Sequence, residues 1–365
     1  MTPRTMRAWR YANGATAKTL VGKLEESIAL DVEAPAPDKS SLAEQQLLIR
    51  VLSASLNPAD YKMPESDWFG RLFGLGSEAQ PGLDFCGRVV GKHPLNTAYS
   101  DGQRVFGSLA KASRYGALGD FVVASASEVA AVPDGVTDDQ AAALGTSAGI
   151  AYKSLRSAGI KPGSHVLING GSGGVGTYSI QLAKLMGAEV TTSTSASHVE
   201  LVRSLGADHV IDYRTTDVIA ELRRRGPVFD AVVDNVGTPS DLYDQCHGFL
   251  KNTGIYVQVA ASPTARATCD TLAALSKSFV MPGRRAFRFA ADKGASSDYA
   301  LLARWVAEGK LKPVIGRSFG FDDVARAYAE LRKGRSTGKI VVHVSVSEGG
   351  DDDDGGEADS RHTRG

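Results

Sequence analysis

The chain has 365 residues, which is enough for two domains of ordinary size. Lysine plus arginine equals aspartate plus glutamate at 41 each, so no excess charge draws the chain to nucleic acid or to an anionic membrane. The three cysteines cannot all pair and match no metal-binding spacing, which favours a reduced, cytoplasmic setting. We find no signal peptide and no apolar run of membrane-spanning length, and expect no membrane span.

The part of the chain before Pro133 is predicted to be rich in β-strands. Glycine and proline punctuate it, and no long helical periodicity is present. The predicted strands are Gln46–Ala54, Phe85–Val90, Gly102–Gly107 and Gly119–Ala124. A compact, antiparallel, barrel-like unit is the expected arrangement.

After Pro133 two helices, Asp138–Leu144 and Gly149–Ser157, lead into an alternation of strands and helices. The predicted strands are His165–Asn169, Glu189–Thr194, Val210–Asp212, Phe229–Asp234 and Gly254–Val259. The predicted helices between them are Gly174–Met186, His198–Leu205, Thr216–Arg224 and Leu242–Leu250. This spacing predicts a doubly wound parallel sheet.

Two amphipathic helices, Asp298–Glu308 and Phe321–Lys333, and a strand, Lys339–Val344, complete the predicted elements. Beyond them the composition turns to glycine and aspartate, with four consecutive aspartates. Few apolar residues remain to form a core, so residues 346–365 are expected to be a disordered acidic tail.

The strongest motif is a glycine-rich loop between a predicted strand and a predicted helix. It reads Asn-Gly-Gly-Ser-Gly-Gly-Val-Gly over residues 169–176 and contains the pattern Gly171-x-Gly173-x-x-Gly176. In such loops the first glycine allows the tight turn, the second lets the backbone approach a pyrophosphate, and the third lets the helix pack on the strand. Gly174 and Val175 open the helix, whose free N–H groups favour the anion. The alternative is an ordinary glycine-rich turn.

The end of the next strand indicates which dinucleotide would bind. An NAD site places an acid about 20 residues after the loop, where it holds the ribose hydroxyls. Here residues 191–198 read Thr-Thr-Ser-Thr-Ser-Ala-Ser-His, with no Asp or Glu. Ser195 and Ser197 leave room for a 2′-phosphate and can donate to it, and His198 could add positive charge. The sequence therefore favours NADPH, although Ser197 could equally be a helix N-cap.

Seven stretches in fixed order resemble the quinone oxidoreductase-like branch of the medium-chain dehydrogenases/reductases, including plant alkenal reductases and fungal trans-acting enoyl reductases. They are Leu56–Lys62, Pro81–Gly87, Asp101–Val105, Gln140–Leu144, the glycine loop, Ser204–Tyr213 and Thr337–Val342. The resemblance implies a GroES-like β-rich catalytic domain, residues 1–128 with 296–345, and a Rossmann NADPH-binding domain, residues 129–295. A homodimer is one state that it allows.

Zinc-dependent relatives place a cysteine ligand near Asn57 and a Gly-His-Glu motif near Gly82. This chain has Asn57 and Gly82-Leu83-Asp84 at these places, so neither a thiolate nor an imidazole is available there. Zinc needs such ligands. We therefore expect no metal.

The resemblance also implies roles for single residues. Asn57, Asp60, Tyr61 and Lys62 would line the nicotinamide cleft, and Thr146 would also bind the cofactor. Tyr213 would help to hold the 2′-phosphate, Asn235, Val259 and Ala260 would border the nicotinamide ribose, and Gly338 and Lys339 would reach back to the cofactor. The alternatives are turn chemistry for Asn57 and Asp60, a core aromatic for Tyr213 and a plain charge at a strand start for Lys339.

The hypothesis for the reaction is hydride transfer from NADPH to an α,β-unsaturated carbonyl or a quinone, with charge developing on the carbonyl oxygen. Tyr61, Lys62 or water could stabilise that oxygen or supply the proton. Aromatic residues in Ser66–Gly76 and Phe279–Phe289 suggest a small hydrophobic acceptor. An alcohol dehydrogenase is disfavoured by the missing zinc ligands. A non-catalytic NADPH-binding partner protein is the alternative from another class.

Overall fold

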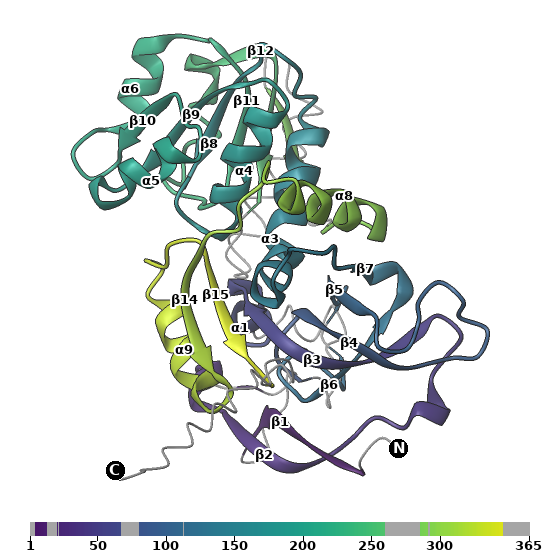
Figure 1. Cartoon of the computed structure of the whole chain (residues 1–365). Coiled ribbons are helices and arrows are strands. Elements are labelled where there is room, and N and C mark those ends of the chain that lie inside the picture. The colour runs from purple at the N-terminus through teal and green to yellow at the C-terminus, as the bar shows by residue number, and fades with distance from the viewer. Residues whose placement is uncertain are drawn as a thin grey trace, which may run out of the picture.

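The computed structural model describes residues 4–12, 20, 22–66, 80–111, 113–259, 285–290 and 293–345. Two large sheets form two bodies, with the helices α3 (Asp138–Ser157) and α8 (Ser296–Ala307) between them (Figure 1). The predicted acidic tail, residues 346–365, lies outside the described residues. No helix of the described ranges combines the length and the apolarity needed to cross a bilayer.

The first sheet joins the N-terminal part of the chain to its C-terminal part. Its strand order is β14-β15-β3-β4-β5-β7, and β6 pairs with β3. The strands are β3 (Gln46–Leu56), β4 (Asp84–Lys92), β5 (Arg104–Ser108), β6 (Phe121–Ser125), β7 (Val129–Ala131), β14 (Ile315–Gly320) and β15 (Lys339–His343). β15 runs antiparallel to β3 and pairs Ile340 with Leu56. This pairing brings Lys339 to the residues that follow β3.

The second sheet is parallel throughout, with the order β10-β9-β8-β11-β12-β13. Its strands are β8 (His165–Asn169), β9 (Glu189–Thr194), β10 (His209–Asp212), β11 (Phe229–Asp234), β12 (Leu250–Gln258) and β13 (Ala286–Phe289). The helices α4 (Gly174–Leu185), α5 (Val199–Ser204) and α6 (Val218–Arg225) connect its first strands. The chain order reverses between β8 and β11, and ligands of such sheets bind at the carboxyl ends of the strands at this reversal.

The predicted fold class, a β-rich unit beside a doubly wound parallel sheet, is confirmed. The exact division into residues 1–128 with 296–345 and residues 129–295 stays a prediction. A two-stranded antiparallel sheet of β1 (Thr5–Tyr11) and β2 (Ile28–Pro35) was not expected from the sequence, nor was the edge strand β14. β14 has mostly exposed or half-buried residues, so it lacks the apolar pattern that marks a buried strand.

The two helices expected at 138–144 and 149–157 form one helix, α3, with a kink at Gly145. Thr137 caps it, because the Thr137 hydroxyl accepts from the Gln140 backbone N–H at 3.2 Å. A Cβ at Gly145 would lie 2.5 Å from the carboxyl carbon of Asp84, so only glycine fits there. The kink thereby brings the middle of α3 against the start of β4.

The helix predicted over Leu242–Leu250 is wrong. The chain makes turns there, followed by a short 3-10 segment, Cys246–Gly248, and β12 already begins at Leu250. Leu242, Tyr243 and Phe249 are nevertheless buried in one apolar cluster. Their spacing fits a helix, but burial in this cluster is satisfied by a compact turn, and tertiary packing overrides the local pattern.

Candidate cofactor and active site

The glycine loop lies between β8 and α4. At two of its three motif glycines the surrounding protein leaves no room for a side chain. A Cβ at Gly176 would lie 2.1 Å from the Gly170 carbonyl oxygen, and one at Gly171 would lie 2.2 Å from Thr192 Oγ1. At Gly173 the nearest atom would be 3.8 Å away. The space above Gly173 is therefore open on the protein side. An open cradle at a helix N-terminus fits a pyrophosphate.

Hydrogen bonds from β9 and from the segment before β15 hold this loop in place. The Gly170 backbone N–H donates to Ser193 Oγ at 2.9 Å, and the Ser193 hydroxyl donates to Asn169 Oδ1 at 2.5 Å. The Gly338 backbone N–H donates to the Ser172 carbonyl at 2.9 Å. The C-terminal segment thus reaches the loop at Gly338, and a contact of Gly338 with the cofactor stays a prediction. Val175 lies half-buried in the first turn of α4.

Beyond β9 the predicted phosphate-binding residues form one polar cluster. Ser195 Oγ lies 3.0 Å from Ser197 Oγ and 3.0 Å from His198 Nδ1. His198 Nε2 lies 2.8 Å from Thr337 Oγ1, a partner that sequence reasoning missed. Its position next to Gly338 is the sequence feature that could have pointed to Thr337. The cluster, Ser195, Ser197, His198 and Thr337, offers hydroxyl and imidazole donors and no carboxylate.

Tyr213 follows β10 at the same edge of the sheet. Its backbone N–H donates to the Thr194 carbonyl at 3.1 Å, and its residue is 53% exposed. The alternative that Tyr213 is a core aromatic is therefore wrong. An exposed ring beside the end of β9 remains free to contact a bound nucleotide.

Asn235 and Val259 follow β11 and β12 and lie at the carboxyl edge of the parallel sheet. The Asn235 backbone N–H donates to the Asn169 carbonyl at 3.2 Å, and that of Val259 donates to the Asp234 carbonyl at 2.9 Å. Both side-chain polar atoms of Asn235 are buried and have no hydrogen-bond partner among the described residues. A buried amide of this kind needs a partner, which a bound ligand can supply. Ala260 lies outside the described residues.

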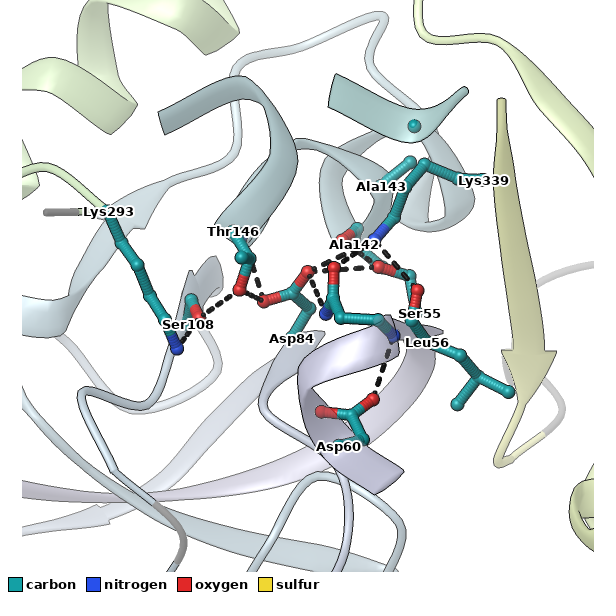
Figure 2. A network of polar contacts seen from close by, with 12 residues as sticks. Ser55, Leu56, Asp60, Asp84, Ser108, Ala142, Ala143, Thr146, Lys293 and Lys339 are labelled. Atoms are coloured by element: carbon teal, nitrogen blue, oxygen red, sulfur yellow. Dashed lines mark hydrogen bonds and ion pairs between the residues drawn. The ribbon is translucent and has the colours of Figure 1, made fainter. Parts of the chain in front are cut away.

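A buried polar network centred on Asp84 joins the first sheet to α3 (Figure 2). Asp84 Oδ2 accepts from Asn57 Nδ2 at 2.8 Å and lies 3.4 Å from Lys339 Nζ. Asp84 Oδ1 accepts from the Thr146 hydroxyl at 2.6 Å and from the Thr146 backbone N–H at 2.9 Å. Lys339 Nζ also donates to Asn57 Oδ1 at 2.7 Å. The structure thereby brings Asn57, Thr146 and Lys339 together, and their common partner Asp84 was not among the predicted site residues.

The charges in this network support one another. Burial by itself raises the pKa of Asp84, but the ammonium groups of Lys339 and Lys293 and the hydrogen bonds from Thr146 and Asn57 hold it below its usual range. Burial lowers the pKa of Lys339, and the carboxylate of Asp84 opposes that shift. Asp84 and Lys339 are 0% and 2% exposed, so the pair is screened little by solvent. The alternative of Lys339 as a plain strand-start charge is therefore wrong.

Asp60 lies in the short helix α1 (Pro58–Lys62), and its side chain caps the N-terminus of that helix. Its Oδ2 accepts from the Asn57 backbone N–H at 2.8 Å and from the Tyr328 hydroxyl at 3.4 Å. Its Oδ1 is buried and has no partner within the described ranges. Burial raises the pKa of Asp60 to about 7. The turn around Pro58 therefore explains the hydrogen bond from the Asn57 N–H to Asp60 Oδ2. It does not explain why Asp60 Oδ1 is buried without a partner.

The two predicted catalytic residues lie at the end of α1. The Tyr61 ring is covered on one face by the Arg332 guanidinium, whose Cζ is 4.3 Å from the ring centroid. Arg332 is held by Glu25 at 2.6 Å and by Glu65. Burial raises the pKa of Tyr61 and lowers that of Lys62. No hydrogen bond links either side chain to the Asp84 network in the described part of the chain.

The described residues contain no group of three or more His, Cys, Asp or Glu side chains arranged to hold a metal ion. Asn57 Oδ1, at the place of the cysteine ligand in zinc-dependent relatives, accepts from the Lys339 ammonium. Of the expected acceptor-lining segments, Ser66–Gly76 and Phe279–Phe289, residues 67–76 and 279–284 lie outside the described residues. Of the remainder, Phe287 is buried against Tyr243 and Tyr256, and Phe289 is 44% exposed.

Comparisons with known proteins match both sheets. The family model for the alcohol dehydrogenase GroES-like domain matches residues 43–134, and the one for zinc-binding dehydrogenase matches residues 205–342. The chain is 40% identical to the trans-enoyl reductase pgmF of Aspergillus terreus, covering 94% of this chain and 97% of that protein. It is 32% identical to 2-methylene-furan-3-one reductase of Solanum lycopersicum, covering 93% and 80%. The structure of the quinone oxidoreductase from Coxiella burnetii superposes with a TM-score of 0.77 at 30% identity, covering 93% and 99%.

Proposed function

We propose that this chain, which belongs to the quinone oxidoreductase-like medium-chain dehydrogenases/reductases, uses NADPH to reduce the activated C=C of an α,β-unsaturated carbonyl compound or a quinone. The chain is an oxidoreductase, and reductases of this family bind a nicotinamide cofactor. The observation that carries the choice of acceptor is the 40% identity, over 94% of the chain, to a protein named trans-enoyl reductase. The tomato relative, named for an enone substrate, supports the same choice.

The preference for NADPH is supported by the cluster of Ser195, Ser197, His198 and Thr337 beyond β9. Its donors are within hydrogen-bonding distance of one another, and it contains no acid that would hold the 2′-hydroxyl of NAD or repel a 2′-phosphate. Tyr213, exposed beside this cluster, would cover the adenosine side.

The remaining cofactor contacts follow from the loop and the sheet edge. Backbone N–H groups at Gly173, Gly174 and Val175 would hold the pyrophosphate at the N-terminus of α4. The unpartnered amide of Asn235 would pair with the nicotinamide ribose beside Val259 and Ala260. When bound, NADPH supplies the hydride. Tyr61, Lys62 or water would donate to the carbonyl oxygen or supply the proton.

We propose that this reaction runs without zinc. Asn57 and Leu83 occupy the places where zinc-dependent relatives have ligands, and neither side chain is a zinc ligand. The Lys339 ammonium already supplies a positive charge 2.7 Å from Asn57 Oδ1. Metal analysis of purified, active protein tests this proposal, and stoichiometric zinc required for turnover would contradict it.

A reduced, cytoplasmic setting is also proposed, and the buried thiol of Cys86, which forms no disulfide and lies 3.5 Å from Asp138 Oδ1, supports it. A homodimer is proposed only because the family resemblance allows this oligomeric state. Light scattering of the purified chain would test the dimer, and localisation of a tagged full-length chain would test the setting.

The central test measures the consumption of NADPH and NADH against a panel of 2-alkenals, enones and quinones. We expect turnover with NADPH and much slower turnover with NADH. Product analysis by NMR should show a saturated carbonyl from each enone, with the C=O group intact. Reduction of C=O instead would favour an alcohol dehydrogenase. Tight NADPH binding without any turnover would favour the non-catalytic binding protein.

A further inference from the structure

A second lysine, Lys293, is connected to Asp84 through two hydroxyl groups. Lys293 Nζ donates to Ser108 Oγ at 3.3 Å and to the Leu109 carbonyl at 2.9 Å. Ser108 Oγ lies 2.9 Å from Thr146 Oγ1, which lies 2.6 Å from Asp84 Oδ1 (Figure 2). The four side chains therefore form one continuous chain of hydrogen bonds.

The directions of these hydrogen bonds follow from the chemistry of the groups. An ionised carboxylate only accepts, so the Thr146 hydroxyl donates to Asp84. The Ser108 hydroxyl then donates to Thr146 and accepts from Lys293, because an ammonium only donates. Both hydroxyl protons are used within the chain. Lys293 has three N–H groups, of which two are used, and the third has no partner among the described residues.

Lys293 forms no direct ion pair with a carboxylate among the described residues. Asp84 is already paired with Lys339, whose Nζ lies 3.4 Å from Asp84 Oδ2. Lys293 reaches the same carboxylate only through Ser108 and Thr146. Burial lowers the pKa of Lys293, and the charges of Asp84, Asp60 and Glu128 oppose that shift, while Lys339 adds to it. An ammonium that is largely withdrawn from water and has no direct carboxylate partner is stabilised by an anion or a developing negative charge.

The position of Lys293 matches the proposed place of the nicotinamide. Lys293 follows β13, whose last residue Phe289 pairs with Gln258 of β12, and Gln258 pairs with Asp234 of β11. The carboxyl ends of these strands carry Asn235 and Val259. Lys293 thus extends from the ligand edge of the parallel sheet and contacts β5 of the other sheet.

We propose that Lys293 is a further catalytic residue, whose free N–H binds the carbonyl oxygen of the acceptor. This proposal rests on the proposed function. Hydride, with its electron pair, forms a C–H bond at the β-carbon, and the C=C π pair moves to give an enolate. The enolate charge on oxygen meets the Lys293 ammonium. A proton from water then forms the C–H bond at the α-carbon, which gives the saturated carbonyl and leaves NADP⁺.

The kinetic test compares Lys293→Met and Lys293→Gln with Lys161→Met, a matched substitution at an exposed lysine. We expect both Lys293 variants to lower kcat for an enone about 100- to 1,000-fold, as the loss of one oxyanion donor does, with the Kd for NADPH unchanged. Lys161→Met should match the wild type. Wild-type kcat in both Lys293 variants would overturn the proposal, and the unchanged Kd serves as the check of folding.

A second measurement needs no turnover. 4-Nitrophenol, whose phenolate is an oxyanion with visible absorbance, is titrated with pH in the presence of protein saturated with NADP⁺. We expect the wild type to bind the phenolate and lower its apparent pKa, and Lys293→Met to lose this shift while Lys161→Met keeps it. Equal shifts in wild type and Lys293→Met, or no phenolate binding by the wild type, would overturn the proposal. A Lys293-dependent shift in a wild type that reduces no acceptor would contradict the proposed function alone.

Discussion

The ammonium group of Lys339 donates a 2.7 Å hydrogen bond to the side chain of Asn57, although 282 residues separate them in the chain. The contact depends on the antiparallel pairing of β15 with β3. It joins the N-cap of α1 to the segment that also touches the glycine loop through Gly338. The segment at Gly338 and Lys339 therefore connects the glycine loop to the Asp84 network.

Removing Lys339 should destabilise the protein strongly. In Lys339→Met the buried carboxylate of Asp84 loses its counter-charge, and breaking a buried pair in this way costs about 3–5 kcal/mol. Urea unfolding of cofactor-free protein measures the loss. The double variant Lys339→Met with Asp84→Asn should recover part of it, because the carboxylate that lost its direct counter-charge is then neutral. A double variant less stable than Lys339→Met alone would contradict the assignment of the penalty to the buried charge.

Asp60 should make the stability depend on pH. Its pKa is raised from a usual value near 4 to about 7, so the folded state holds a proton that the unfolded state releases. Its contribution is fully present below about pH 4 and is lost as pH rises to about 7, by up to about 1.4 kcal/mol per pH unit. Asp60→Asn cannot titrate, so its urea midpoint should rise relative to wild type across this window. Parallel profiles of the two proteins would contradict the raised pKa.

Substitutions at two glycines of the loop should distinguish an effect on folding from an effect on NADPH binding. Gly176→Ala forces a Cβ against the Gly170 carbonyl oxygen at 2.1 Å, so both the melting temperature and NADPH affinity should fall. Gly173→Ala has open space on the protein side and an extended backbone, with φ at −79°. It should melt within a few degrees of wild type but bind NADPH weakly, as measured by fluorescence titration. Normal NADPH affinity in Gly173→Ala would argue against a pyrophosphate above this residue.

Ser195 should determine the choice between the two nicotinamide cofactors. An aspartate in its place would repel the 2′-phosphate and could accept from the ribose hydroxyls of NADH. Each charge-assisted hydrogen bond contributes about 1.5–3 kcal/mol, so the ratio of kcat/KM for NADPH over NADH should fall at least about 10-fold in Ser195→Asp. Ser204→Asp, at an exposed position on α5, is the control. An unchanged ratio would remove Ser195 from the phosphate site.

The part of the site that could be predicted depends on local signals. The glycine loop follows from a strand, a glycine spacing and a helix within one short segment, and Ser195 to His198 from the absence of an acid after the next strand. Asp84 carried no such signal, because its importance comes from partners in α1, α3 and β15. The failed helix over Leu242–Leu250 shows the same limit, since its apolar residues are buried without helical structure.

By itself, the sequence determined the parallel sheet, the loop between β8 and α4 and the polar end of β9, because hydrophobic periodicity and turn residues act over short distances along the chain. Only the tertiary structure decided which polar groups meet. The pairing of β15 with β3, the kink of α3 at Gly145 and the end of β13 bring Lys339, Asp84 and Lys293 into one network. Strand order and register are set by packing between distant segments, and charges buried by that packing can then only pair with the groups it brings near.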